Sequence, residues 1–287
     1  MACRHRCIKF IFLLVVTMSF TLSFKVWAAV DIATEESRKL NIAVASNFYH
    51  TLQILIAESA DLSFNANVSS GSTGLLYAQI KNGAPFDVFL SADAARPTLL
   101  VQQGLASNKK TFAIGQLVLW PSRVEVETAL KTHQGKLVIA NPTLAPYGKA
   151  AQQVLSFLKL EGVYSKRLIL ANNVNQGFQF VDSGNAPMAM MALSQLKQAQ
   201  LIQAQLKQAQ LMQAQLLQTE RTQLASQNQK YKNFTMIPEA MYSPIHQQLV
   251  KISSSKQKEH SQRFIDWLMS EPIQGRLQQL GYKSQNG

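Results

Sequence analysis

The stretch SSGSTGLLYAQIKNGAPFDVFLSAD occupies residues 69–93 and sets the pattern for the rest of the chain. It begins with six small residues, continues as a helix-like run and ends in the short apolar segment PFDVFL. A small-residue turn, a helix and a buried strand in this order are typical of α/β proteins. The hydroxyls and bare amides at the helix start need an explanation, because a helix leaves its first N–H groups unpaired.

The same order of strand, small-residue loop and helix recurs on both sides of this stretch. It is present in LNIAVASNFYHTLQILIAESA at 40–60, in GKLVIANPTLAPYGKAAQQVL at 135–155 and in RLILANNVNQGFQFVDSG at 167–184. Strands that alternate with helices predict parallel sheets covered on both faces. The functional loops of such sheets lie at the carboxyl ends of the strands.

The N-terminal segment has the features of a secretory signal peptide. Basic residues in MACRHRCIK precede an apolar run, and the small-residue exit VWA predicts cleavage after Ala28. A retained membrane anchor is the alternative, but Lys25 cuts the apolar run short of a span. Removing residues 1–28 takes away both cysteines, four of the 28 basic residues and no acidic one, which leaves a net charge of +8.

Charge and motifs exclude several classes of function. The lysines are scattered without a dense run or interleaved aromatic residues, so we expect a solvated surface rather than a nucleic-acid site. There is no GxSxG elbow, Walker loop or metal-spaced histidine pair, and Ser72 has no base beside it that would make it a nucleophile. The chain is therefore predicted not to be an enzyme and to carry no cofactor.

A glutamine-rich repeat interrupts the α/β pattern. Residues 195–219 read QLKQA QLIQA QLKQA QLMQA QLLQT, and this composition favours a helix. Leucines five residues apart advance by roughly 140° per step, so they form no single apolar stripe and no coiled-coil heptad. We interpret the repeat as an insert in a surface connection; the alternative is an interaction arm.

Four strand-to-helix loops share one unusual composition: ASNF at 45–48, SGSTG at 70–74, APYG at 145–148 and NNVN at 172–175. None of them contains Lys, Arg, Asp, Glu or His. Ser, Thr and Asn at a helix start are commonly just N-caps, which is the simplest interpretation of any single loop. Several helix N-termini that converge, however, could bind a compact dianion through N–H groups and hydroxyls alone.

The missing charges also indicate which anion such a site would take. Hydrogen phosphate keeps a proton and needs an acceptor, whereas a fully ionised tetrahedral oxyanion needs donors only. Loops without carboxylates therefore favour molybdate, tungstate or sulfate over phosphate.

With these residues in view, the chain resembles the periplasmic molybdate-binding proteins of molybdate ABC transporters. AVASNF, the stretch at 69–93, NPTLAPYGKAAQQVL, NNVNQGFQFVDSGNAPMAMMALSQ and LMSEPIQGRLQQLGY stand in the family's order. The resemblance covers residues 40–194 and roughly 233–283. It implies a class II periplasmic binding fold, with two α/β lobes around a ligand cleft.

The resemblance also implies lobes and site residues. Lobe 1 would comprise 31–111 plus 243–287, and lobe 2 would comprise 112–242, with hinge crossings near 111 and 243. The oxyanion would be bound by six residues from the four loops: Ser46, Asn47, Ser72, Thr73, Tyr147 and Val174. Tyr147 and Val174 would donate their main-chain N–H groups.

Two departures accompany these expectations. Some relatives use a tyrosine from the strand at 187–193, where this chain has Ala192, so it resembles the branch that relies on Asn47 and Tyr147. The repeat at 195–219 is foreign to the family pattern. No metal ion would be bound directly, because the oxyanion's oxygen atoms would meet the protein.

The function implied is a monomeric periplasmic receptor that captures molybdate, and also tungstate, and delivers it to an ABC-transporter permease. A binding protein for sulfate or another tetrahedral oxyanion is one alternative, because cavity size decides between such ions. An interaction or scaffold protein that acts through residues 195–219 is the other.

Overall fold

The computed structural model of the chain describes residues 39–59, 65–217 and 227–284. The predicted signal peptide lies outside these residues. Every element named below belongs to one unit, Leu40–Gly287. Among the described helices, none is both long and apolar enough to cross a membrane.

The first sheet has six strands in the order β11-β4-β10-β3-β1-β2. Its strands are β1 (Leu40–Ala45), β2 (Ala66–Gly71), β3 (Val88–Ser91), β4 (Ala106–Gly115), β10 (Ile245–Ile252) and β11 (Tyr282–Lys283). β1 pairs in parallel with β2 and β3, whereas β10 is antiparallel to β3 and β4. The sheet is therefore mixed, which corrects the prediction of purely parallel sheets. β10, on which the chain returns from the second sheet, is antiparallel to both of its neighbours, β3 and β4.

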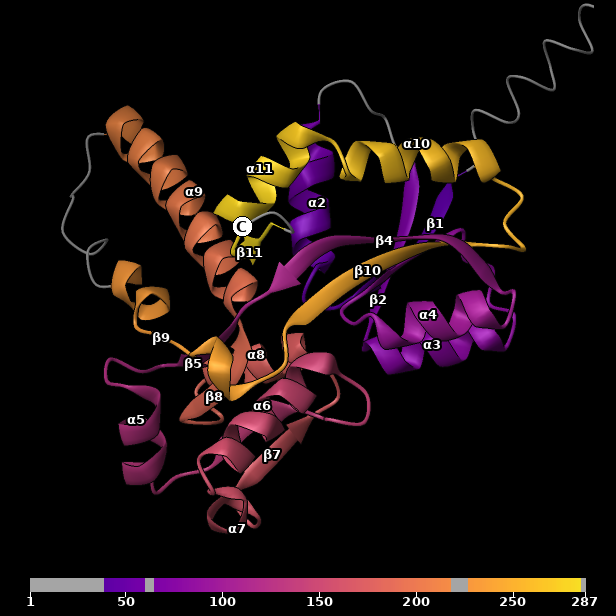
Figure 1. Cartoon of the computed structure of the whole chain (residues 1–287). Helices are drawn as coiled ribbons and strands as arrows, with labels where there is room; N and C mark the ends of the chain where they lie inside the picture. Colours follow the sequence, from indigo (N-terminus) through magenta and orange to yellow (C-terminus); the bar gives the residue numbers. More distant parts are fainter. Residues whose placement is uncertain (1–38, 60–64, 218–226, 285–287) are drawn as a thin grey trace, which may run out of the picture. The chain divides into compact units, whose positions relative to one another are not determined.

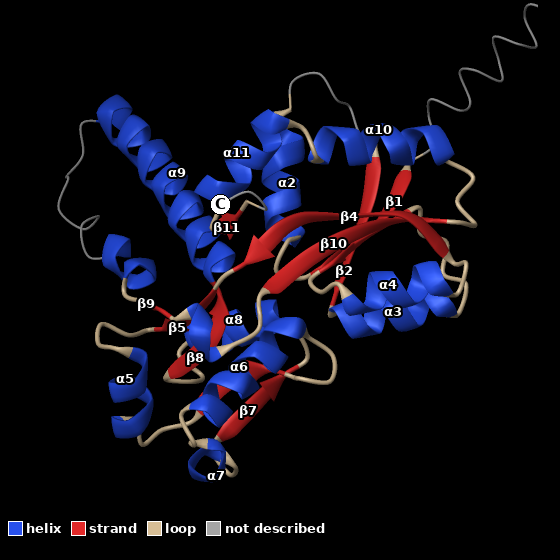
Figure 2. Cartoon of the chain, viewed as in Figure 1, coloured by secondary structure: helices blue, strands red, loops and turns tan. Residues whose placement is uncertain are grey.

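Helices cover both faces of the first sheet, as Figure 2 shows. They are α2 (Tyr49–Glu58), α3 (Thr73–Lys81), α4 (Ala95–Gln102), α10 (Lys258–Leu268) and α11 (Glu271–Gln279). Alternation along β1 explains the two layers, because successive side chains of a strand point to opposite faces. Ile42 and Val44 pack with Phe264 on one side, while Ala43 packs with Leu76 on the other. We call this sheet and its helices the first lobe.

The second sheet has five strands in the order β7-β6-β8-β5-β9. Its strands are β5 (Leu117–Trp120), β6 (Leu137–Ala140), β7 (Leu168–Ala171), β8 (Met188–Ala192) and β9 (Thr235–Met236). β6 is parallel to β7 and β8, and β5 is antiparallel to β8 and β9. All four residues of β5 and of β6 are buried, which explains why these strands read as unbroken apolar runs.

The second lobe is completed by helices around this sheet. They are α5 (Val126–Thr132), α6 (Pro146–Phe157), α7 (Glu161–Tyr164), α8 (Val174–Asp182), α9 (Leu193–Leu217) and the short 3-10 helices η1 (Gln227–Lys232) and η2 (Glu239–Met241). The mixed α/β architecture with two sheets agrees with the fold class that the sequence predicts.

The chain changes sheets at Gln116, between β4 and β5, and returns between β9 and β10. The first change comes five residues after the crossing expected near 111. In the sequence FAIGQLVLW, the polar Gln116 stands between two apolar segments, and Gly115 still pairs with Ile245 in the first sheet. Tyr242 joins the two connections, because its hydroxyl accepts a hydrogen bond from the Leu117 N–H at 3.2 Å.

Residues 195–217 of the repeat lie in a single helix, α9, that starts directly after β8 (Figure 1). Its first turns are not a surface insert. Leu196 is buried in the second core, and Leu201 packs against the core of the first lobe. Gln198 is also buried and donates to Thr51 of α2. Beyond this base, side chains such as Leu206 are exposed, so only the outer part of the helix fits the predicted surface insert.

Candidate functional site

The first candidate loop follows β1 and holds Ser46 and Asn47, both buried. The N–H of Ser46 donates to the Gly71 oxygen at 2.9 Å. The carbonyl of Asn47 accepts from the hydroxyls of Tyr282 at 2.9 Å and Ser194 at 3.3 Å. Among the described residues, neither the Ser46 hydroxyl nor the Asn47 N–H has a hydrogen-bond partner. Both groups are therefore available to a ligand.

The second loop links β2 to α3. Ser72 is the N-cap residue of α3, yet its side chain makes no capping hydrogen bond. The hydroxyl oxygen of Thr73 accepts from the Ala92 N–H at 3.2 Å, which leaves its proton to donate elsewhere. Within the described part of the chain, the Thr73 N–H has no acceptor. The two hydroxyl residues of this loop are thus buried donors rather than helix caps.

The third loop ends at α6, where Pro146 is the first helical residue. Proline has no N–H, so Tyr147 supplies the first N–H of this helix, and it finds no acceptor in the residues that the structure describes. The Tyr147 hydroxyl is buried and accepts from the Gln247 side chain at 3.2 Å. Burial raises the pKa of Tyr147 well above its usual value, so the phenol stays neutral. The Tyr147 side chain therefore fixes the start of α6 through its bond to Gln247, and the Tyr147 N–H is the group that could donate to a ligand.

The fourth loop starts α8 at Val174, which is buried. Asn173 caps this helix, since its side chain accepts from the Gln176 N–H at 3.0 Å. The side-chain amide of Gln195, on α9, is oriented so that both its nitrogen and its oxygen have partners. The nitrogen donates to the Val174 oxygen, and the oxygen accepts from the Asn175 N–H. The Val174 N–H has no acceptor among the described residues. The simple capping interpretation therefore holds for this loop and not for the second.

Hydrogen bonds between the loops bring all four together. Asn47 donates to Gln247, which donates to Tyr147, and this chain links the first loop with the third. Gly74 donates to the Leu144 oxygen at 2.9 Å and links the second loop with the third. Ser194 bonds the first loop, while its neighbour Gln195 bonds the fourth. The loops of both lobes thus surround one region.

This region is electrically neutral. The loop segments 45–48, 70–74, 145–148 and 172–175 carry no ionisable side chain except the neutral Tyr147. Across the described residues, no group of three or more His, Cys, Asp or Glu side chains could hold a metal ion. The arrangement therefore suits an anion that needs donors and no counter-charge. Ala192 is buried at the end of β8.

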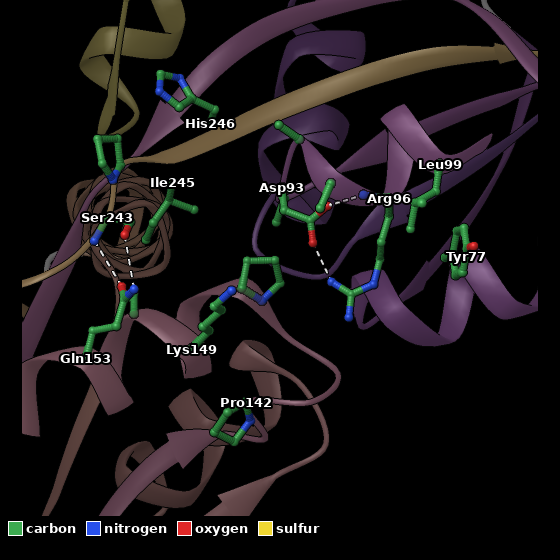
Figure 3. Close-up of a pocket in the computed structure, with 16 residues that line it drawn as sticks. Tyr77, Asp93, Arg96, Leu99, Pro142, Lys149, Gln153, Ser243, Ile245 and His246 are labelled. Atoms are coloured by element: carbon green, nitrogen blue, oxygen red, sulfur yellow. Dashed lines mark hydrogen bonds and ion pairs between the residues drawn. The ribbon is translucent and has the colours of Figure 1, made fainter. Parts of the chain in front are cut away.

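A cavity of about 520 Å³ adjoins these loops (Figure 3). It is lined from both lobes and shares Ala92 and Pro146 with the surroundings of the second and third loops. Unlike the loops it carries charge, from the Asp93–Arg96 ion pair and from Lys149. The Arg96 guanidinium also donates to the Thr143 oxygen at 3.0 Å and so bridges the lobes. None of the six predicted residues lines this cavity.

Sequence reasoning missed the residues that hold the loops in place, chiefly Gln247, Tyr282 and Ser194. They lie at least 147 residues from Asn47, their partner in the first loop. One signal was available, because IHQQLVKI alternates and Gln247 occupies an inward position between Ile245 and Leu249. A glutamine among buried apolar neighbours requires hydrogen-bond partners.

Comparison with known proteins shows the family to which the chain belongs. The family model of bacterial extracellular solute-binding proteins matches residues 40–283. The molybdate-binding protein ModA of Azotobacter vinelandii is 33% identical over 276 residues, which are 92% of this chain and 99% of the relative. ModA of Rhodobacter capsulatus is 30% identical over 247 residues, covering 84% of this chain and 86% of the relative.

A solved structure gives the same result. The periplasmic molybdate-binding protein of Azotobacter vinelandii superposes with a TM-score of 0.71 at 30% identity, over 86% of this chain and 99% of that chain. The fold and these matches together define an extracellular binding protein. The chain belongs to the bacterial extracellular solute-binding protein family, and the expected resemblance and the non-enzymatic class are confirmed.

Proposed function

We propose that this protein captures molybdate in the periplasm and delivers it to the permease of an ABC transporter. The observation that carries the proposal is the set of four loops, which contain no charged side chain. Among the described residues, the N–H groups of Asn47, Thr73, Tyr147 and Val174 have no acceptor. The similarity to molybdate-binding relatives along nearly the whole chain supports the same ligand.

In this proposal six residues hold the oxyanion, namely Ser46, Asn47, Ser72, Thr73, Tyr147 and Val174. The serine and threonine residues donate hydroxyl protons, and Asn47, Thr73, Tyr147 and Val174 donate main-chain N–H groups. The partial positive charge at the starts of α3, α6 and α8 adds to these hydrogen bonds. A dianion that keeps no proton meets no repelling acceptor in such a ring.

Tungstate has the same charge and shape as molybdate, and we include it as a second ligand. Delivery requires that the permease recognises the ligand-bound, closed arrangement of the lobes. We further propose that the mature protein is a monomer that begins after Ala28. N-terminal sequencing of the protein purified from the periplasm tests the cleavage point.

The deciding experiment is a calorimetric titration of the mature protein with molybdate, tungstate, sulfate and phosphate. We expect tight, one-to-one binding of molybdate and tungstate, weaker binding of sulfate and none of phosphate. Sulfate binding tighter than molybdate binding would assign the site to the smaller ion. Binding that depended on residues 195–219, and no oxyanion binding, would instead favour a scaffold acting through the repeat.

A further inference from the structure

Gln247 is fully buried on β10, close to where the chain returns to the first lobe. Its side-chain oxygen accepts from the Asn47 side chain at 3.0 Å. Its side-chain nitrogen donates to the Tyr147 hydroxyl at 3.2 Å. Asn47 belongs to the first lobe and Tyr147 to the second. One amide therefore connects two of the candidate loops across the lobes.

The space around this amide is built to hold it. A Cβ on Gly115 of β4 would lie 2.1 Å from the Tyr147 hydroxyl oxygen and 2.9 Å from the Gln247 side-chain nitrogen. Any residue larger than glycine at 115 would displace the phenol from its partner. The close approach of β4, β10 and α6 is thus what lets Tyr147 reach Gln247.

An uncharged amide suits this position for a chemical reason. It offers an acceptor at one end and a donor at the other, which are the two functions that its partners take up here. A buried apolar side chain would leave the Asn47 nitrogen without an acceptor. An ionised carboxylate would put a negative charge beside the region proposed to hold a dianion.

The contacts of Asn47 show what Gln247 controls. The carbonyl of Asn47 is held by Tyr282 and Ser194, and its side-chain nitrogen is held by Gln247. With those groups fixed, the turn can present the Asn47 N–H in one direction only. On the other lobe, the anchored phenol fixes the start of α6, where the Tyr147 N–H has no acceptor among the described residues.

We propose that Gln247 is a positioning residue that aligns the Asn47 and Tyr147 N–H donors for the oxyanion without touching the ion itself. This inference rests on the proposed function. Because the Gln247–Tyr147 hydrogen bond joins the two lobes, its loss acts on dissociation of the ligand more than on association.

The test compares the mature protein with Gln247→Met, Tyr147→Phe and the double variant, by stopped-flow binding of molybdate. Methionine keeps the length of glutamine and removes both hydrogen bonds, and phenylalanine keeps the Tyr147 backbone. We expect Gln247→Met to lower affinity about tenfold, mostly through a faster dissociation rate. Tyr147→Phe is expected to add almost nothing in the Gln247→Met background, because both changes break the same bond.

Gln248→Met is the matched control on the same strand. Gln248 donates to Thr111 at 3.0 Å, and among the described residues it makes no hydrogen bond to the four loops, so this variant is expected to bind as the wild type does. Thermal unfolding without ligand shows whether each variant is folded. Unchanged molybdate kinetics in folded Gln247→Met, or losses that add in the double variant, would overturn the inference.

A second measurement needs no ligand. Nuclear magnetic resonance of the Asn47 side-chain amide reports proton exchange, and we expect slow exchange in the wild type and in Gln248→Met but faster exchange in Gln247→Met. Equal exchange rates in all three would overturn the positioning role. If the wild type bound no oxyanion, the proposed function would fail, while this measurement would still decide whether Gln247 orients Asn47.

Discussion

Two neighbouring regions between the lobes differ in how they use charge. The four loops surround a neutral region of N–H groups and hydroxyls, whereas the adjoining cavity carries Asp93, Arg96 and Lys149. The charged region includes a contact between the lobes, from Arg96 to the Thr143 oxygen. The comparison indicates that the charged side chains lie beside the proposed anion site, and that uncharged N–H groups and hydroxyls would bind the anion.

The largest loss of affinity is expected when a negative charge is placed among the uncharged loops. Ser46→Asp is expected to lower molybdate affinity by a thousandfold or more, because like charges about 4 Å apart repel by about 4 kcal/mol at an effective dielectric constant of 20. Lys149→Asp, which reverses a charge in the neighbouring cavity, is expected to cost less than about tenfold. Calorimetry on both variants measures this; similar losses would contradict the comparison.

Removing a donor without adding charge has a smaller effect. Ser46→Ala deletes one hydroxyl, and a hydrogen bond to a charged group contributes about 1.5–3 kcal/mol. We expect affinity to fall roughly ten- to hundredfold, with the unfolding temperature of the unliganded protein unchanged. An affinity equal to that of the wild type would remove Ser46 from the set of ligand-binding residues.

The approach of the lobes can be tested through Gly74. A Cβ there would lie 3.1 Å from the Leu144 oxygen and 3.0 Å from the Arg96 guanidinium nitrogen, so Gly74→Ala holds the second and third loops apart. The expected result is a dissociation rate raised by about three- to tenfold. Gly275→Ala is the control, because a Cβ on that residue of α11 meets nothing within 4 Å. Equal rates in the two variants would argue against a tight contact at Gly74.

Lys149→Ala should have a still smaller effect. Lys149 is exposed on α6, and an exposed charge contributes little to binding that neutral donors dominate. We expect less than about a threefold loss at physiological salt. A greater loss than that of Ser46→Ala would mean that charge pairing, rather than dipoles, holds the ligand.

The least change is expected from pH. Burial raises the pKa of Tyr282 from 10.0 to about 12 and raises the pKa of Tyr147 well above its usual value, so both phenols keep their protons and affinity should be constant from pH 7 to 9. The unfolded chain loses these protons near pH 10. Stability should therefore be constant below pH 10 and fall between 10 and 12, by about 2–3 kcal/mol for Tyr282. Denaturant titrations across this range measure the effect; a fall below pH 9 would contradict it.

Local patterns predicted the strands and the loops, whereas the two lobes were expected only from the resemblance to molybdate-binding proteins. Unbroken apolar runs such as residues 137–140 mark buried strands, and small uncharged residues after them mark the loops. The two-lobed α/β fold class is confirmed. The assignment of Ser46, Thr73 and Val174 to the ligand stays a prediction, although their loops lie together.

What the sequence could not supply depends on distant contacts. The change of sheets at Gln116 carries no loop-length signal, because a single residue separates β4 from β5. The burial of Gln198 at the base of α9 depends on Thr51, 147 residues away, and the repeat pattern gives no sign of it. The hydrogen bonds of Gln247 to Asn47 and Tyr147 likewise depend on contacts between residues far apart in the sequence.

The anchored base of α9 has a consequence for how this protein can evolve. Each pentapeptide copy added to the repeat would lengthen the helix by about 7.5 Å and turn its tip by roughly 140°. Since Ser194, Gln195 and Gln198 fix the first turns, copies added beyond them leave the ligand loops where they are. The number of repeats can therefore change without disturbing the contacts at the base of α9.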